Sequence, residues 1–146
     1  MCKQVQTIRN GLRRFNRWAG VLKTDPYEIG LSLSQSSALV DIERSGKLKP
    51  QELAHLLNLD KSSVSRLIAV LESKNLIKVT NDSDDKRSKD LTLTVKGKEM
   101  VQKIHRISDQ SVVEVLNLLG EKDRTEIALA FEKLAYAVEQ LEKNND

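Results

Sequence analysis

Apolar residues recur every three or four positions over most of the chain, which is the spacing of one face of an α-helix. This pattern predicts helices over about residues 3–23, 34–46, 50–57, 61–74, 95–119 and 121–142. Ser34 is the predicted N-cap of the second helix, and Gly46 ends it. Asp25-Pro26 is predicted to stop the first, because the residue before proline avoids α-helical backbone. Other helix ends are marked by capping or breaking residues: Pro50, Asp60 or Ser62, Thr94 and Gly120.

The period of the pattern changes to two between the fourth and fifth helices. Residues 76–80 and 90–94 alternate as strands do, and the polar segment 81–89 between them predicts a β-hairpin with a long loop. The expected fold is mainly α with one small hairpin, a winged helix-turn-helix. We expect one integrated domain, with the winged helix-turn-helix in residues 34–96 between dimerisation segments at 1–33 and 97–146. The terminal helices carry apolar stripes too extensive for so small a core to cover, which predicts a homodimer.

The fourth helix has an apolar face and a face suited to DNA. If Val64, Leu67 and Leu71 point inward, a turn of about 100° per residue places a small, polar stripe on the other side. This stripe consists of Ser62, Arg66, Ala69 and Ser73, with Ser63 and Ser65 on its flanks. Small side chains let a helix enter the major groove, where serine and arginine bond base edges. The alternative is an ordinary solvated face.

Charge is distributed unevenly along the chain. The net charge is +3, but residues 61–98 hold nine basic against five acidic residues, whereas residues 99–146 hold six against ten. In the hairpin loop Lys86, Arg87 and Lys89 stand among aspartates. A cation at a hairpin tip can enter the minor groove, where the potential is most negative. The aspartates would then hold the shape of the loop through backbone N–H groups. The alternative is a loop that is only solvated.

Several classes of function lack the residues they need. The only histidines, His55 and His105, have no metal-ligand partner three or four residues later in the chain except Asp109, and the glycines form no phosphate-binding loop. A single cysteine, Cys2, excludes a disulfide within the chain; it is a frayed thiol or a redox sensor. No apolar run reaches membrane-spanning length, and residues 1–4 do not begin a signal peptide. We therefore expect a cytoplasmic protein that is not an enzyme and has no metal or cofactor.

Five segments together resemble the MarR family of transcription regulators. They are QELA at 51–54, LDKSSVSRLI at 59–68, LESKNLI at 71–77, DSDDKRSK at 82–89 and LTVKG at 93–97. The resemblance implies a repressor, open to control by an effector, that binds a pseudo-palindromic operator as a homodimer through its terminal helices. It places the DNA contacts of the recognition helix at Lys61, Ser62, Ser63, Ser65, Arg66 and Ser73. It places those of the wing at Asp85, Lys86, Arg87 and Lys89, with Arg87 at the wing tip and Asp85 orienting it.

The chain departs from the family pattern at three positions. Asp84 stands where arginine is frequent, Asn75 where glycine is common, and Lys49 where serine or threonine caps a helix. Asp84 makes the wing less basic, which keeps open an alternative function, a winged helix that binds only protein.

Two further partners follow from the N-terminal residues. Trp18 and Tyr27, with Arg14 and its neighbours Arg13 and Arg17, suit a pocket for an aromatic or anionic effector. The other interpretation places Trp18 in a dimer core and leaves the arginines solvated. Binding of the basic segment 3–23 to a membrane surface is disfavoured, because that segment lacks a large aromatic face.

Overall fold

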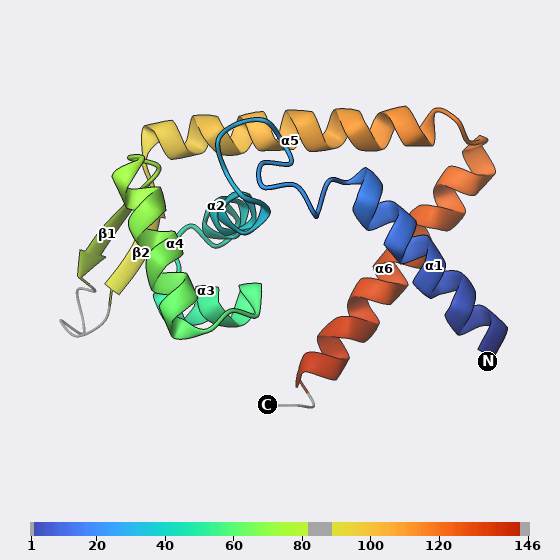
Figure 1. The fold of residues 1–146 in the computed structure, drawn as a ribbon, viewed down its shortest axis with the longest axis horizontal. Helices are drawn as coiled ribbons and strands as arrows, with labels where there is room; N and C mark the ends of the chain where they lie inside the picture. The colour runs from blue at the N-terminus through green and yellow to red at the C-terminus, as the bar shows by residue number, and fades with distance from the viewer. Residues whose placement is uncertain (1, 82–88, 144–146) are drawn as a thin grey trace. The chain divides into compact units, whose positions relative to one another are not determined.

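The computed structural model describes residues 2–81 and 89–143 (Figure 1). It is mainly helical with one antiparallel hairpin, which confirms the predicted fold class. The elements are α1 (Cys2–Trp18), α2 (Leu33–Ser45), α3 (Pro50–Leu57), α4 (Lys61–Ser73), β1 (Ile77–Asn81), β2 (Lys89–Leu93), α5 (Val95–Leu116) and α6 (Glu121–Lys143). The chain divides into two compact units, Met1–His105 and Arg106–Asp146, and each is described by itself.

The core of the first unit lies among α2, α3, α4, the hairpin and the first turns of α5. Leu39, Ile42, Leu53 and Leu71 are fully buried there. The remaining buried apolar residues are Leu31, Ala38, Leu48, Val64, Leu67, Leu76, Ile77, Leu91, Val101 and Ile104. Removing this much apolar surface from water holds the helix-turn-helix and the hairpin together as one body.

Helix α2 begins two residues earlier than the sequence predicted. Its N-cap is Ser32 and not Ser34, so that prediction was wrong. The Ser32 hydroxyl accepts the Gln35 N–H at 3.2 Å, and the Gln35 side chain accepts the Ser32 N–H at 3.0 Å. This reciprocal pair satisfies two backbone donors that the helix leaves without partners, which explains why Ser32 is preferred. Gly46 ends the helix at φ +75°, as predicted.

Helix α1 ends at Trp18, several residues before the predicted end at about residue 23. The backbone turns at Gly20, whose φ of +69° is one that glycine adopts at little cost. Asp25 comes later and organises the connection, since its carboxylate accepts the N–H groups of Ile29 at 3.0 Å and Gly30 at 2.6 Å. These bonds, that from Ile29 foremost, lower the pKa of Asp25.

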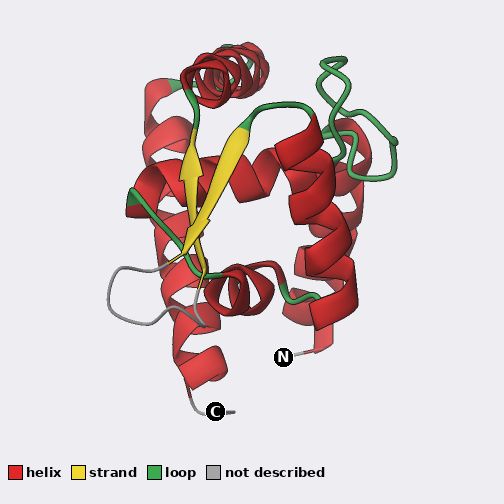
Figure 2. Ribbon diagram, turned by 90° about the vertical axis from the view of Figure 1, so that its left-hand side faces the viewer, coloured by secondary structure: helices red, strands yellow, loops and turns green. Residues whose placement is uncertain are grey.

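Strands β1 and β2 pair in register, with Ile77 opposite Leu93 and Asn81 opposite Lys89 (Figure 2). The wing-tip residues expected to touch DNA, Asp85, Lys86 and Arg87, lie outside the described residues. At the base of the wing, Leu48 and Leu91 exchange two backbone hydrogen bonds, of 3.1 and 2.8 Å. The loop between α2 and α3 therefore continues the hairpin and fixes β2 to the helix-turn-helix.

Helix α5 starts directly after β2, and its first turn packs closely against the backbone of Leu76. The Thr94 hydroxyl accepts the Gly97 N–H at 3.0 Å, which confirms Thr94 as the cap of this helix. A Cβ atom on Gly97 would lie only 2.0 Å from the carbonyl oxygen of Leu76. Only glycine lets the helix approach the start of β1 so closely.

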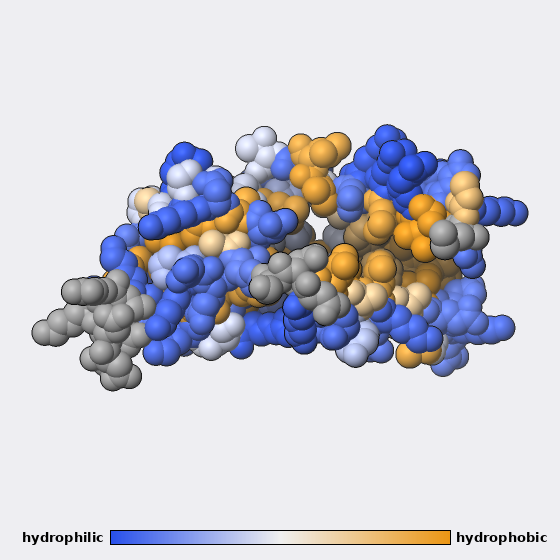
Figure 3. All heavy atoms as spheres, turned by 90° about the horizontal axis from the view of Figure 1, so that it is seen from below, coloured by the Kyte–Doolittle hydropathy of each residue, from blue (hydrophilic) through white to orange (hydrophobic). Residues whose placement is uncertain are grey.

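The second unit holds the later turns of α5 and all of α6. Helix α5 ends at Leu116, before the predicted residue 119, and α6 follows its predicted bounds to within one residue. The described side chains of α6 include exposed apolar ones, among them Phe131, Leu134 and Leu141. Apolar residues at the surface are visible on the face drawn in Figure 3. Within the described residues, no helix is long and apolar enough to cross a membrane.

Candidate nucleic-acid interface

Helix α4 presents the polar face that its sequence predicts. Val64, Leu67 and Leu71 are buried in the core. The residues on the opposite side, Ser62, Arg66, Ala69 and Ser73, are exposed, as are the flanking Lys61 and Ser65, while Ser63 is half-buried. The side chains of this face are mostly small, and Arg66 is the longest of them. A helix with small side chains on its outer face can reach base edges in the major groove.

Asp60 caps α4 and bonds both serines of its first turn. Its Oδ1 atom accepts the backbone N–H groups of Ser62 and Ser63, each at 2.9 Å. Its two carboxylate oxygens also accept the two serine hydroxyls, each at 2.6 Å. These bonds hold the pKa of Asp60 well below its usual range, and the bond from the Ser62 hydroxyl lowers it most, followed by that from the Ser63 hydroxyl. Asp60 is therefore a carboxylate at neutral pH.

The chain of hydrogen bonds continues to the arginine. Arg66 donates from Nη2 to the Ser63 hydroxyl oxygen at 3.1 Å. A hydroxyl has one proton and two lone pairs, so Ser63 can donate to Asp60 and accept from Arg66 at once. At the other end of the helix, the Ser73 hydroxyl donates to the Val70 carbonyl at 2.8 Å.

A groove of about 460 Å³ runs beside the N-terminal end of α4. Among the described residues, lysines from three elements line it: Lys49 before α3, Lys61 at the start of α4 and Lys89 at the start of β2. Gln51 and Ser65 add polar groups to the lining. The groove therefore suits an anion such as a phosphate.

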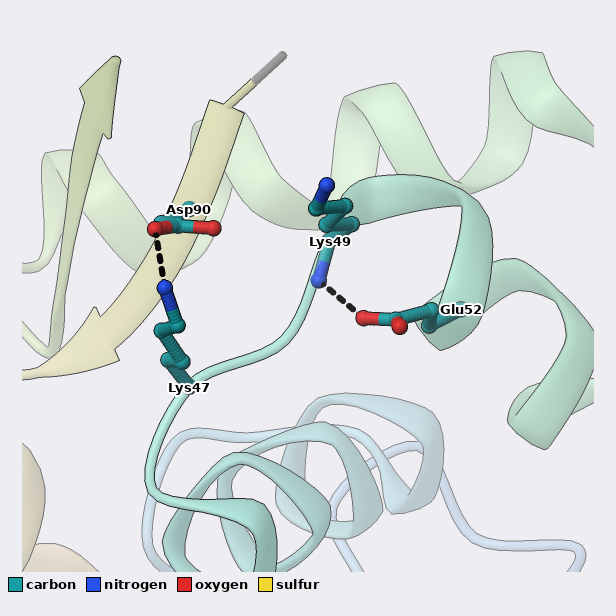
Figure 4. Close-up of polar contacts among 4 residues, drawn as sticks. All are labelled: Lys47, Lys49, Glu52 and Asp90. Carbon is teal, nitrogen blue, oxygen red and sulfur yellow. Dashed lines mark hydrogen bonds and ion pairs between the residues drawn. The ribbon is translucent and has the colours of Figure 1, made fainter. Parts of the chain in front are cut away.

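Two contacts hold the groove's margin in place (Figure 4). The Lys47 ammonium lies 2.9 Å from Asp90 Oδ2, which ties the loop before α3 to β2. The Glu52 carboxylate accepts the Lys49 N–H at 2.7 Å. This is half of a capping box; an ammonium has no lone pair, so the Lys49 side chain does not supply the other half.

The structure brings together residues that lie far apart in sequence. Lys61 and Lys89, both predicted DNA contacts, meet at the groove. Sequence reasoning missed Lys49 and Gln51, which line the same groove. The sequence marked Lys49 only as a departure from the usual helix cap, and its place beside Lys61 and Lys89 arises from tertiary packing.

The residues predicted to line an effector pocket are placed on different segments. Trp18, the last residue of α1, is 45% exposed and its ring contacts Phe15 with centroids 5.3 Å apart. Tyr27 is half-buried and packs against the core, and Arg14 is exposed on α1. The groove beside α4 is lined by other residues. An effector site at these three residues stays a prediction.

The two histidines lie on α3 and α5. His105 Nε2 lies 3.0 Å from Glu43 Oε2, so α5 is linked to α2, and His55 is exposed on α3. Within residues 2–81 and 89–143, no group of three or more histidine, cysteine or carboxylate side chains is placed to hold a metal ion.

Comparison with known proteins agrees with the resemblance in the sequence. Residues 31–89 match the model of the MarR family. The transcriptional repressor MdtR of Bacillus subtilis strain 168 is 31% identical over 116 residues, which cover 80% of this chain and 75% of MdtR. FabT of Streptococcus pneumoniae, solved in complex with DNA, has a TM-score of 0.79 at 19% identity, covering 94% of this chain and 99% of that one.

A second solved structure, of BpsR from Bordetella bronchiseptica, has a TM-score of 0.70 at 21% identity and covers 88% of this chain and 98% of that one. That work concerns the regulation of DNA binding by 6-hydroxynicotinic acid. The two solved structures support the fold, and the match to MdtR extends over enough of both chains to show the family. Its members are regulators rather than enzymes. The chain therefore belongs to the MarR family and is a DNA-binding transcription regulator.

Proposed function

We propose that this regulator binds a pseudo-palindromic operator as a homodimer and represses transcription in the cytoplasm. The observation that carries the proposal is the exposed face of α4, with Arg66 at its centre, directly beside the lysine-lined groove. A face that reads bases and a groove that takes phosphates are the two components that sequence-specific binding requires.

In this proposal α4 enters the major groove of DNA. Arg66 forks onto a guanine, and Ser62, Ser65 and Ser73 lie along base edges. Lys49, Lys61 and Lys89 contact the phosphates that flank the groove, which fixes the register of the helix. From the loop between β1 and β2, the wing contributes Lys86 and Arg87 to the minor groove, with Asp85 orienting Arg87.

Dimerisation is supported by the apolar faces of the terminal helices. Helix α1 buries none of its side chains in the single chain, and Val5 and Ile8 are each 55% exposed. Helix α6 exposes Phe131, Leu134 and Val138 in the same way. Stripes of this size on a water-soluble chain are typical of an interface between subunits.

Control by a small molecule is part of the same proposal. BpsR has the same fold, and its DNA binding is regulated by 6-hydroxynicotinic acid, an aromatic acid. Arg14, Trp18 and Tyr27 would suit an aromatic or anionic molecule of this kind, through ring stacking and a guanidinium that pairs with a carboxylate.

Substitution of Arg66 tests the proposal. We expect Arg66→Ala to lower the ratio of operator affinity to random-DNA affinity, by about 1–3 kcal/mol for the base pair concerned. The measurement is fluorescence anisotropy with DNA from upstream of the protein's own gene and with a random duplex of equal length.

Arg66→Lys is the matched control, because it keeps the charge and loses the planar fork. It should bind random DNA like the parent and still lose discrimination. If Arg66→Ala weakens binding to both DNAs equally, Arg66 contacts a phosphate. If the parent itself does not distinguish the two DNAs, the proposed operator binding is wrong.

A further inference from the structure

We propose that Asp60 is a positioning residue that determines the specificity of α4 by holding Arg66 through Ser63. The inference rests on the proposed reading of bases by Arg66. The structure carries it as an unbroken sequence of side chains, from the Asp60 carboxylate to the Ser63 hydroxyl at 2.6 Å and from that hydroxyl to Arg66 Nη2 at 3.1 Å.

The direction of each hydrogen bond follows from chemistry. An ionised carboxylate only accepts and a guanidinium only donates. Ser63 therefore gives its proton to Asp60 and offers a lone pair to Arg66. Without the carboxylate, the hydroxyl would be free to rotate and present its proton to the guanidinium, which would repel it. The ionised carboxylate thus fixes the one orientation of Ser63 that holds Arg66.

The same bonds keep the hydroxyl groups of Ser62 and Ser63 from binding phosphates. Phosphate oxygens accept hydrogen bonds, and the hydroxyl protons of Ser62 and Ser63 are already given to Asp60. The carboxylate also repels phosphate. These groups are therefore placed to present lone pairs to amino groups of cytosine or adenine, and to orient Arg66 toward a guanine, rather than to bind the backbone.

Holding an arginine in place matters because its side chain is long and exposed. A free arginine loses rotamer freedom when it is fixed on a base. An arginine that is already held in one arrangement loses less, so more of the guanine contact appears as discrimination.

Asp60→Asn tests this role, because positioning and electrostatics predict different results. Removing an acid near DNA should leave affinity for random DNA equal or higher. Asparagine caps helices as well as aspartate does, but its amide replaces one accepting oxygen with a donor. We expect discrimination at the base pair that Arg66→Ala identifies to fall about fivefold or more, the lower end of what a bidentate contact supplies.

Further variants separate positioning from capping. Ser63→Ala removes the intermediate hydroxyl and should cause a similar loss, and the double variant Asp60→Asn/Ser63→Ala should lose no more than either alone. Asp60→Ser keeps a capping residue and repeats the test should the asparagine variant unfold. Glu72→Gln, in the same helix, makes the same change of charge and should keep discrimination. Melting temperatures of all variants report whether the cap survives.

The outcomes distinguish this inference from the function beneath it. If Asp60→Asn and Ser63→Ala keep the parent's discrimination at that base pair, the positioning role is wrong and operator binding stands. Equal loss of binding to both DNAs with a lower melting temperature would make Asp60 a cap alone. If the parent shows no base preference that depends on Arg66, the inference fails together with the proposed reading.

Discussion

Lys49 occupies the N-cap position of α3 although its ammonium cannot accept a hydrogen bond. Glu52 compensates by accepting the Lys49 N–H, so the helix start keeps one of its two capping bonds. The Lys49 side chain lines the groove with Lys61 and Lys89. A position at the start of a helix thus adds a positive charge to the groove that we propose to contact DNA.

We predict that Lys49→Gln lowers the salt dependence of DNA binding. Each lost lysine–phosphate contact reduces the slope of log affinity against log salt by about 0.9, so two subunits lose about 1.8. The loss should be alike for operator and random DNA, since phosphates carry no sequence information. Anisotropy titrations at a series of salt concentrations measure the slope.

Lys103→Gln is the matched control, as an exposed lysine of α5 that does not line the groove. It removes the same charge and should leave the slope closer to the parent's. An unchanged slope for Lys49→Gln would mean that the groove does not hold a phosphate.

At the scale of elements, the junction of the wing with α5 depends on one residue. Gly97 brings the first turn of α5 against the backbone of Leu76, and a carbonyl oxygen cannot move aside as a flexible side chain can. The wing's first strand begins at the next residue, Ile77. A side chain at position 97 would therefore disturb the helix and the hairpin together.

We predict that Gly97→Ala destabilises the protein, by about 1–3 kcal/mol or more, as overpacking of a core does. Thermal unfolding followed by circular dichroism measures the change. Gly120→Ala is the control, because the nearest atom to a Cβ there, Asp123 Oδ2, is 3.9 Å away. It should cost less than about 1 kcal/mol. Equal effects of the two substitutions would contradict the close contact at Gly97.

Elements whose signals are local could be predicted from the sequence. The two faces of α4 follow from its helical period, and Thr94 and Gly46 mark helix ends that the structure confirms. The start of α2 was missed because four serines lie close together there, at positions 32, 34, 36 and 37; only the Ser32 and Gln35 pair makes reciprocal bonds. The groove could not be predicted, since its lysines, at positions 49, 61 and 89, converge only through tertiary packing.

At the scale of the whole molecule, the exposed apolar faces of the terminal helices form the proposed dimer interface. We predict a dimer at micromolar concentration by light scattering, with a melting temperature that rises with protein concentration, as binding between subunits requires. Ile8→Glu on α1 and Leu134→Glu on α6 place charges on exposed apolar faces and should shift the protein toward monomer. A monomeric parent protein would contradict the proposed interface.

The paired backbones of Leu48 and Leu91 have a consequence for how such a regulator releases DNA. Because the wing's second strand is bonded to the loop that begins the helix-turn-helix, we expect the wing base and α4 to move together. In the proposed control by an effector, the change then acts on the wing and α4 as a unit. In the proposed dimer, an effector can change the spacing of the two recognition helices, which fit successive major grooves only about 34 Å apart. A small rotation of each subunit is then enough to misalign both recognition helices with the major grooves.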